Sequence, residues 1–172
     1  MGGDAQILPH CNIHWIVMIF ACFGNVPAYL TFTRMAKAVD QLAASINEEV
    51  FVQSGNAVYN FRYAKAIPFL CHEEMIRKMV ESNVVIVHGG WGSISEASDL
   101  GCKIVAMPRI KGKEHNHDQW QLVKALEKAN VLFCCEDEKD LPALVEKART
   151  HQFSPIQYGD ATKIIKDFIS SI

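Results

Sequence analysis

The residues best suited to binding a ligand lie in one glycine-rich stretch, residues 88–97 (HGGWGSISEA). Gly89, Gly90 and Gly92 follow an apolar run, and a helical pattern begins directly after them. A glycine-rich turn that leads into a helix leaves backbone N–H groups unpaired at the positive end of the helix dipole, where a phosphate or diphosphate can bind. Ser93 would add a hydroxyl donor, so the stretch predicts an anion site.

The same stretch also fits a purely structural interpretation. Ser93 and Glu96 have the Ser-x-x-Glu spacing of a capping box, in which two side chains satisfy the free amides of their own helix. Spacing alone favours neither interpretation, and both stay open at this point.

Two familiar nucleotide-binding loops do not match the glycines. The dinucleotide fingerprint requires G-x-G-x-x-G, whereas residues 89–93 read GGWGS, and the apolar run at 103–107 leads into Pro108 and Arg109 rather than an acidic residue. A P-loop requires Gly-Lys-Ser or Gly-Lys-Thr after its glycines, and neither follows here.

Short apolar runs alternate with longer amphipathic ones along the chain, which predicts an α/β fold: a Rossmann-like parallel sheet with helices on both faces. We expect strands at 16–23, 49–54, 66–70, 83–88, 103–107 and 131–135, and helices at 28–46, 72–81, 93–100, 116–129, 138–149 and 160–171. Ligands bind at the carboxyl ends of such strands, so the loops at 24–27, 71–73 and 88–93 are candidates.

Composition limits the domain organisation and the class of partner. A chain of 172 residues with 49% hydrophobic content fits one domain, which we place at 18–172, after an extension or cloning remnant at 1–17. The net charge of -2 and the scattered Lys and Arg argue against nucleic acid. Six cysteines without a C-x-x-C pair favour a reducing, cytoplasmic location, and the apolar run at 13–23 is too short to span a membrane.

Two linked motifs carry a resemblance to a known family. Residues 88–97 resemble the nucleotide-sugar signature of GT-B glycosyltransferases, including H-C-G-W-N-S-x-x-E of the plant UDP-sugar enzymes. Residues 117–119 (HDQ) match the second half of that signature, and residues 104–109 (IVAMPR) match the strand and proline between the halves.

From Met18 onward the chain resembles the C-terminal domain of glycosyltransferase family 28, the donor half of a GT-B enzyme. It is most similar to the split, single-domain members: the cytosolic subunit of the dolichol-linked N-acetylglucosamine transferase and the PssE-type exopolysaccharide subunits. Residues 23–25 (FGN) stand where that group has a Val-Gly-Thr turn. Residues 108–119 have the pattern P-R-x-x-x-x-E-H-x-x-x-Q, which resembles the pattern of that group. The spacing before Gln119 is one residue shorter here than the spacing expected for the group.

The resemblance implies a nucleotide-sugar site built from all three candidate loops. The donor diphosphate would be held by Gly89, Gly90, Gly92 and Ser93, with Gly24 and Asn25 facing it and His88 touching it. Glu96 would bind the ribose, and the backbone of Phe69 and Leu70 would bind the uracil. Asp118 and Gln119 would bind the sugar hydroxyls. Ordinary alternatives stay open: a plain turn at 24–25, strand burial at 69–70, and a histidine hydrogen-bonded within the sheet at 88.

The resemblance also implies an inverting hexosyl transfer from a UDP-sugar, in polysaccharide or glycolipid biosynthesis. Such a transfer needs a general base for the acceptor and a stabilised diphosphate leaving group. We expect this chain to stabilise the diphosphate leaving group. A membrane-anchored partner subunit would supply the general base and the site for a lipid-linked sugar acceptor at the cytoplasmic membrane face. No catalytic residue of this chain is assigned.

No cofactor or metal is expected. Residues His10, Cys11 and His14 lack a fourth ligand, whereas Glu114, His115, His117 and Asp118 would suit a divalent ion in an extended segment. Family 28 members need no bound metal, so the metal interpretation is the lesser one.

Two other functions and one structural question stay open. A non-catalytic nucleotide-binding or regulatory module is the main alternative; an epimerase or hydrolase fits less well, because no Tyr-x-x-x-Lys pair or nucleophile elbow is present. The apolar stripe of the predicted helix at 160–171 would pack on its own domain or dock the partner.

Overall fold

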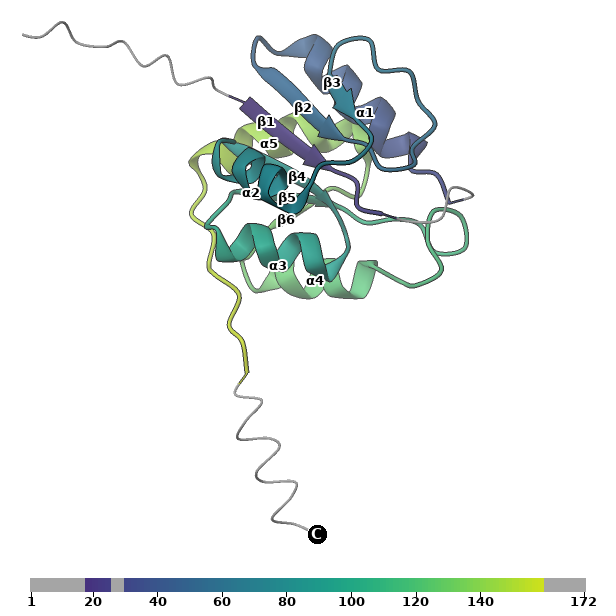
Figure 1. Cartoon of the computed structure of the whole chain (residues 1–172). Helices are drawn as coiled ribbons and strands as arrows, with labels where there is room; N and C mark the ends of the chain where they lie inside the picture. Colours follow the sequence, from purple (N-terminus) through teal and green to yellow (C-terminus); the bar gives the residue numbers. More distant parts are fainter. Residues whose placement is uncertain (1–17, 26–29, 160–172) are drawn as a thin grey trace, which may run out of the picture.

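The computed structural model describes residues 18–25 and 30–159, and these form a six-stranded, all-parallel sheet in the order β3-β2-β1-β4-β5-β6 (Figure 1). The strands are β1 (Met18–Cys22), β2 (Glu49–Gln53), β3 (Lys65–Ile67), β4 (Val84–His88), β5 (Ile104–Met107) and β6 (Phe133–Cys134). The prediction of a Rossmann-like parallel sheet is confirmed. The predicted extension at 1–17 and helix at 160–171 lie outside the described residues, so the domain boundaries stay predictions.

Helices cover both faces of the sheet, as predicted. They are α1 (Thr33–Ser45), α2 (His72–Val80), α3 (Trp91–Asp99), α4 (Trp120–Lys128) and α5 (Leu141–Thr150), with a 3-10 turn, η1 (Glu138–Asp140), before the last. One core cluster joins α1 and α5 to the sheet, and a second joins α2, α3 and α4 to it (Figure 1). None of the described helices is long and apolar enough to cross a membrane.

The two central strands explain why the sheet is covered on both sides. Every residue of β1 is buried, and β4 is buried up to its last residue, His88. Strands that are apolar throughout must be packed on both faces, which is typical of parallel sheets. Helix α1 is amphipathic, because Met35, Val39 and Leu42 are buried while Lys37 is exposed, although the polar residue Asp40 is buried as well.

Several predicted boundaries were wrong by a few residues. Helix α3 begins at Trp91 rather than 93, and β3 ends at Ile67, before Pro68, rather than at 70. The largest error is at α1, which begins at Thr33 instead of 28, and α4 begins at Trp120 instead of 116. The Asp118 carboxylate accepts a hydrogen bond from the Trp120 N–H at 2.8 Å, and this contact marks the start of the helix.

Candidate functional site

The imidazole of His88 lies between two glycine turns at the carboxyl edge of the sheet. A Cβ atom on Gly24 would come within 2.2 Å of the His88 Nε2, and one on Gly90 within 2.1 Å of its Cε1. Gly24 also has a φ of +70°, a conformation that side chains other than glycine disfavour. These two glycines are therefore required by the space that the histidine ring occupies.

Gly92 differs from the other glycines of the stretch. A Cβ on Gly89 would lie 2.8 Å from the Cβ of Gln119, so Gly89 is packed against α4. Around Gly92, in contrast, no described atom beyond its chain neighbours and the backbone of its own helix lies within 4 Å of an added Cβ. The backbone is thus open to a ligand at Gly92, whereas at Gly24, Gly89 and Gly90 it packs against the protein.

The start of α3 has no side-chain cap within the described chain. Gly90 is the N-cap residue, and Ser93 is already the third residue of the helix. The Ser93 hydroxyl lies 3.9 Å from the Cys22 sulfur, and Glu96 faces another helix. The capping-box interpretation is therefore wrong, and the first amides of α3 remain available to an anion.

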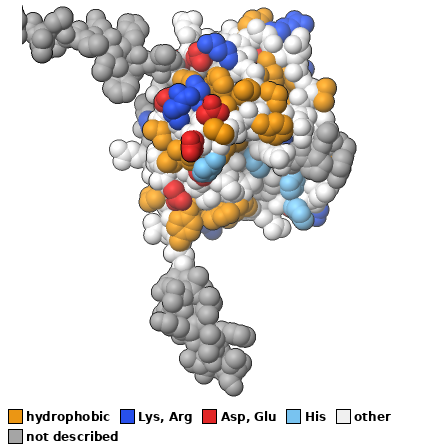
Figure 2. All heavy atoms as spheres, viewed as in Figure 1, with side chains coloured by type: hydrophobic (Ala, Val, Ile, Leu, Met, Phe, Trp, Pro, Cys, Tyr) orange, Lys and Arg blue, Asp and Glu red, His pale blue; other side chains and the backbone are white. Residues whose placement is uncertain are grey.

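Glu96 faces His72, the first residue of α2. Its Oε1 lies 3.3 Å from the His72 Nε2, and Glu96 also lines a groove of about 580 Å³ between α2 and α3. The groove is lined by Met75, Ile76, Gly92, Ser93, Ser95, Glu96, Asp99 and Leu100. Figure 2 shows hydrophobic, acidic and histidine side chains exposed together over these two helices. Three of the predicted binding residues thus line one groove.

The loop after β3 leads directly into this region. Gly55 N–H and the Gln53 side-chain amide both donate to the carbonyl of Pro68, at 2.8 and 3.2 Å, which anchors the loop to β2. Phe69 is 47% exposed, and Leu70 packs partly on the core. The strand-burial interpretation is therefore wrong for Phe69, which lies beyond the strand and faces solvent.

Gln119 joins the second half of the predicted signature to the first. It is buried at the start of α4, its Oε1 accepts a hydrogen bond from the Arg109 N–H at 3.0 Å, and its Nε2 lies 3.4 Å from the His88 Nδ1. Asp118 is exposed beside it. The structure thus brings residues 88–90 and 118–119 together, as the resemblance implied, although Gln119 is already bound to the protein at both ends of its amide.

His88 is held neutral. Burial lowers its pKa to about 4, and electrostatic interactions with Arg109 and His115 add to this effect, while the hydrogen bond with Gln119 opposes it. A neutral imidazole can donate one hydrogen bond and accept another, but it brings no positive charge to a phosphate. The contact with Gln119 also agrees with the ordinary alternative, a hydrogen-bonded histidine at the end of its strand.

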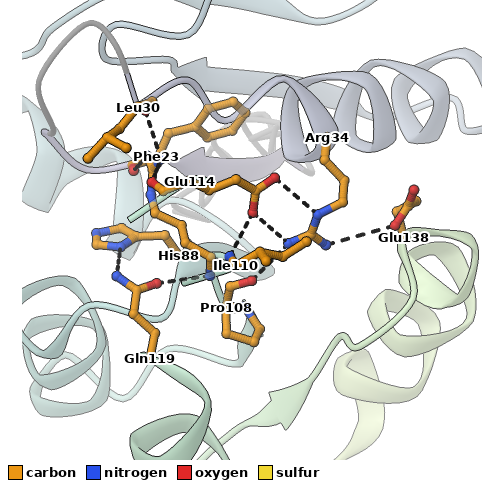
Figure 3. Close-up of polar contacts among 10 residues, drawn as sticks. Phe23, Leu30, Arg34, His88, Pro108, Ile110, Glu114, Gln119 and Glu138 are labelled. Carbon is orange, nitrogen blue, oxygen red and sulfur yellow. Dashed lines mark hydrogen bonds and ion pairs between the residues drawn. The ribbon is translucent and has the colours of Figure 1, made fainter. Parts of the chain in front are cut away.

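The sequence motifs gave no role to three residues that the structure places at this edge: Arg109, Arg34 and His72. Arg109 is 1% exposed and donates to the carbonyls of Phe23, Leu30 and Glu114. The Glu114 carboxylate binds Arg34 at 3.0 Å and accepts from the Ile110 N–H at 2.9 Å (Figure 3). The sequence signal that could have indicated Arg109 is its position as a charged residue just after the apolar strand β5. His72, at the start of a helix on the same edge, is the third.

The predicted metal alternative gains no support from this geometry. The carboxylate of Glu114 forms an ion pair with Arg34, and the carboxylate of Asp118 accepts a hydrogen bond from the Trp120 N–H. Among residues 18–25 and 30–159, no group of three or more His, Cys, Asp or Glu is placed to hold a metal ion.

Comparisons with known proteins place the chain among glycosyltransferases. The model of the glycosyltransferase family 28 C-terminal domain matches residues 28–172. Among solved structures, the glycotransferase of kitacinnamycin is similar over 88% of this chain and 39% of its own, with a TM-score of 0.62 and 14% identity. MurG of Acinetobacter baumannii matches 91% of this chain and 50% of its own, with a TM-score of 0.52 and 18% identity.

A third similar structure is the spinosyn rhamnosyltransferase SpnG complexed with thymidine diphosphate, which matches 77% of this chain and 36% of its own, with a TM-score of 0.57 and 15% identity. The chain thus spans half or less of the length of each of these enzymes. A search of curated proteins found no match. At such identities the structures show the fold alone, while the family model covers most of the sequence. The chain therefore belongs to glycosyltransferase family 28, as its C-terminal domain.

Proposed function

We propose that this chain binds the UDP-sugar donor of an inverting hexosyl transfer and works with a partner subunit on a lipid-linked acceptor. The observation that carries the proposal is the uncapped start of α3, which opens at Gly92 into the groove that Ser93 and Glu96 also line. A helix start with free amides and no Cβ in the way is suited to a diphosphate.

The groove offers places for the rest of the nucleotide. Glu96 lies one helical turn beyond Ser93, so its carboxylate can accept hydrogen bonds from ribose hydroxyls while the diphosphate is bound at the helix start. Its present partner, His72, follows closely on Phe69 and Leu70, whose backbone we propose for the base. Ribose and base would then lie side by side across α2 and α3.

The chemistry of transfer follows from the same arrangement. When the bond between the sugar carbon and the diphosphate oxygen breaks, negative charge grows on the leaving group, and the amides and dipole of α3 would stabilise it. Because the amide of Gln119 is bound to Arg109 and His88, we expect the exposed carboxylate of Asp118 to make the more direct contact with the sugar.

The acceptor side is proposed to come from a membrane-anchored subunit at the cytoplasmic face, which would also supply the general base. The similar solved enzymes are two to three times as long as the stretch that this chain matches in them, which supports a further half. If purified chain and partner bind donor but never transfer sugar to lipid, the alternative of a non-catalytic nucleotide-binding module would be favoured.

Titration calorimetry tests donor binding. We expect UDP and UDP-N-acetylglucosamine to bind at micromolar to millimolar strength, and Glu96→Ala to weaken both without unfolding the protein. Thymidine diphosphate, the ligand of SpnG, serves as the competing nucleotide and tests the choice of nucleoside, because it differs from UDP in the base and in the 2′-hydroxyl. Absence of binding by every uridine nucleotide would overturn the proposal, whereas a stable Glu96→Ala variant with full affinity would remove Glu96 from the site.

A further inference from the structure

Arg109 is a buried cation that holds two loops together at the carboxyl edge of the sheet. Its guanidinium donates to the carbonyls of Phe23 at 2.9 Å, Leu30 at 3.4 Å and Glu114 at 3.1 Å. Phe23 and Leu30 lie at the two ends of the connection from β1 to α1, and Glu114 lies between β5 and α4 (Figure 3). One side chain therefore links Phe23 and Leu30 to the segment that contains Glu114.

Both loops border the glycine turns. Gly24 follows the first of these carbonyls in sequence, and the His88 ring lies between Gly24 and Gly90. At the far end of the second loop, Gln119 accepts from the Arg109 N–H and approaches the same histidine ring. A change at Arg109 would therefore shift the two turns with respect to each other.

The charge of Arg109 is not matched by an ion pair within the described chain. The Glu114 carboxylate binds Arg34 and the Ile110 N–H, and only its backbone carbonyl accepts from Arg109. The Arg109 Nε is buried without a hydrogen-bond partner among the described residues, and the guanidinium lies 4.2 Å from the centre of the Phe32 ring. Burial lowers the pKa of Arg109 to about 10, so the group is charged at neutral pH.

We propose that Arg109 is a positioning residue for the donor diphosphate: it fixes the Gly24 turn against the Gly89–Gly90 turn and adds positive potential where an anion would bind. This inference rests on the donor binding proposed above. Arg109 acts through the loops and through its field, which is strong because a buried charge is poorly screened by water.

The test compares two ligands that differ by the diphosphate alone. In Arg109→Met we expect calorimetry to show a loss of UDP affinity of about tenfold, with uridine affinity changed by less than roughly twofold. Lys128→Met is the matched control, because it removes one exposed positive charge at the opposite end of α4. This control should bind UDP as the unmodified chain does.

A second variant covers the case in which Arg109→Met does not fold. Arg109→Lys keeps the charge but lacks the planar fork that reaches several carbonyls, so UDP affinity should fall about threefold while uridine binding is kept. NMR titration of His88 in folded Arg109→Met should show its pKa rising, since a neighbouring positive charge is lost while Gln119 and His115 remain.

Three results would separate the two proposals. If the unmodified chain binds no uridine nucleotide, the donor site itself is wrong. If it binds UDP but the folded Arg109 variants lose UDP and uridine equally, or bind both as tightly as before, only the role of Arg109 is overturned. A His88 pKa that does not move would likewise exclude the effect of the Arg109 charge at this edge.

Discussion

Alanine substitutions in the glycine turns should separate packing from ligand approach. Alanine at position 90 places its Cβ 2.1 Å from the His88 Cε1, and alanine at position 24 places it 2.2 Å from the Nε2. Alanine at position 92 meets no described atom within 4 Å. We therefore expect Gly24 and Gly90 to be needed for the stability of the fold, and Gly92 to be needed only for binding.

The magnitudes follow from the kind of strain. Forcing a methyl group into a filled site costs about 1–3 kcal/mol, which is the loss in free energy of unfolding expected for Gly90→Ala. At Gly24 the φ of +70° adds about 1–2 kcal/mol for a residue with a Cβ, so Gly24→Ala should lose about 2–5 kcal/mol in total. Gly92→Ala lies in the first turn of α3 and should be neutral or slightly stabilising.

Urea unfolding followed by circular dichroism measures the stabilities, and calorimetry measures UDP binding. We expect Gly92→Ala to fold normally and bind UDP about tenfold more weakly, because the methyl group occupies the path of the ligand. The double variant His88→Ala, Gly90→Ala tests the cause, since removing the ring should remove most of the cost at position 90. Equal destabilisation by Gly90→Ala with and without the ring would refute the reasoning, as would a Gly92→Ala variant that unfolds like Gly24→Ala.

Three further predictions concern single side chains. Folding lowers the pKa of His88 from 6.5 to about 4, so its contribution to stability is full above pH 6.5 and is lost as the pH falls from 6.5 to 4, by about 3 kcal/mol. His88→Gln should flatten this part of the pH profile of urea unfolding. Asp118→Ala should lose about 1 kcal/mol of unfolding free energy, because its hydrogen bond to Trp120 is lost, whereas Asp118→Asn should keep most of that stability. In calorimetry, Asp118→Asn should weaken the binding of UDP-sugar but not that of UDP. If Asp118→Asn binds UDP-sugar as tightly as the unmodified chain does, Asp118 is not part of the sugar site. Buried Asp40 accepts from three successive backbone amides, 62–64, so Asp40→Ala should lose about 2–3 kcal/mol in urea unfolding, with unchanged UDP affinity of the folded protein.

The centre of the sheet was predictable because β1, β4 and β5 are local apolar runs. Residues 84–88 (VVIVH) must be buried on both faces, and the 3.6-residue period of α1 identifies its buried face without any tertiary information. Boundaries were less predictable, since they depend on single contacts. The start of α4 at Trp120, for example, is fixed by the neighbouring Asp118 carboxylate, which the helical pattern before it does not show.

The site was predictable as a set of loops, but the roles within it were not. Sequence spacing could not decide whether Ser93 and Glu96 cap their helix, because that depends on where the helix begins and on His72, a residue of another helix. Nor could it show that Gly24 and Gly90 make room for His88. A buried Arg109 also runs against the usual expectation that charged residues are exposed.

The sequence by itself determined the alternation of strands and helices, the glycine-rich turn and the paired motifs that resemble family 28, because these depend on neighbours in the chain. The tertiary structure alone decided which glycine is open to a ligand, which carboxylate faces the groove and which cation holds the loops together. Those properties depend on distances between residues such as Phe23 and Arg109, which lie 86 positions apart in the chain yet share a 2.9 Å hydrogen bond.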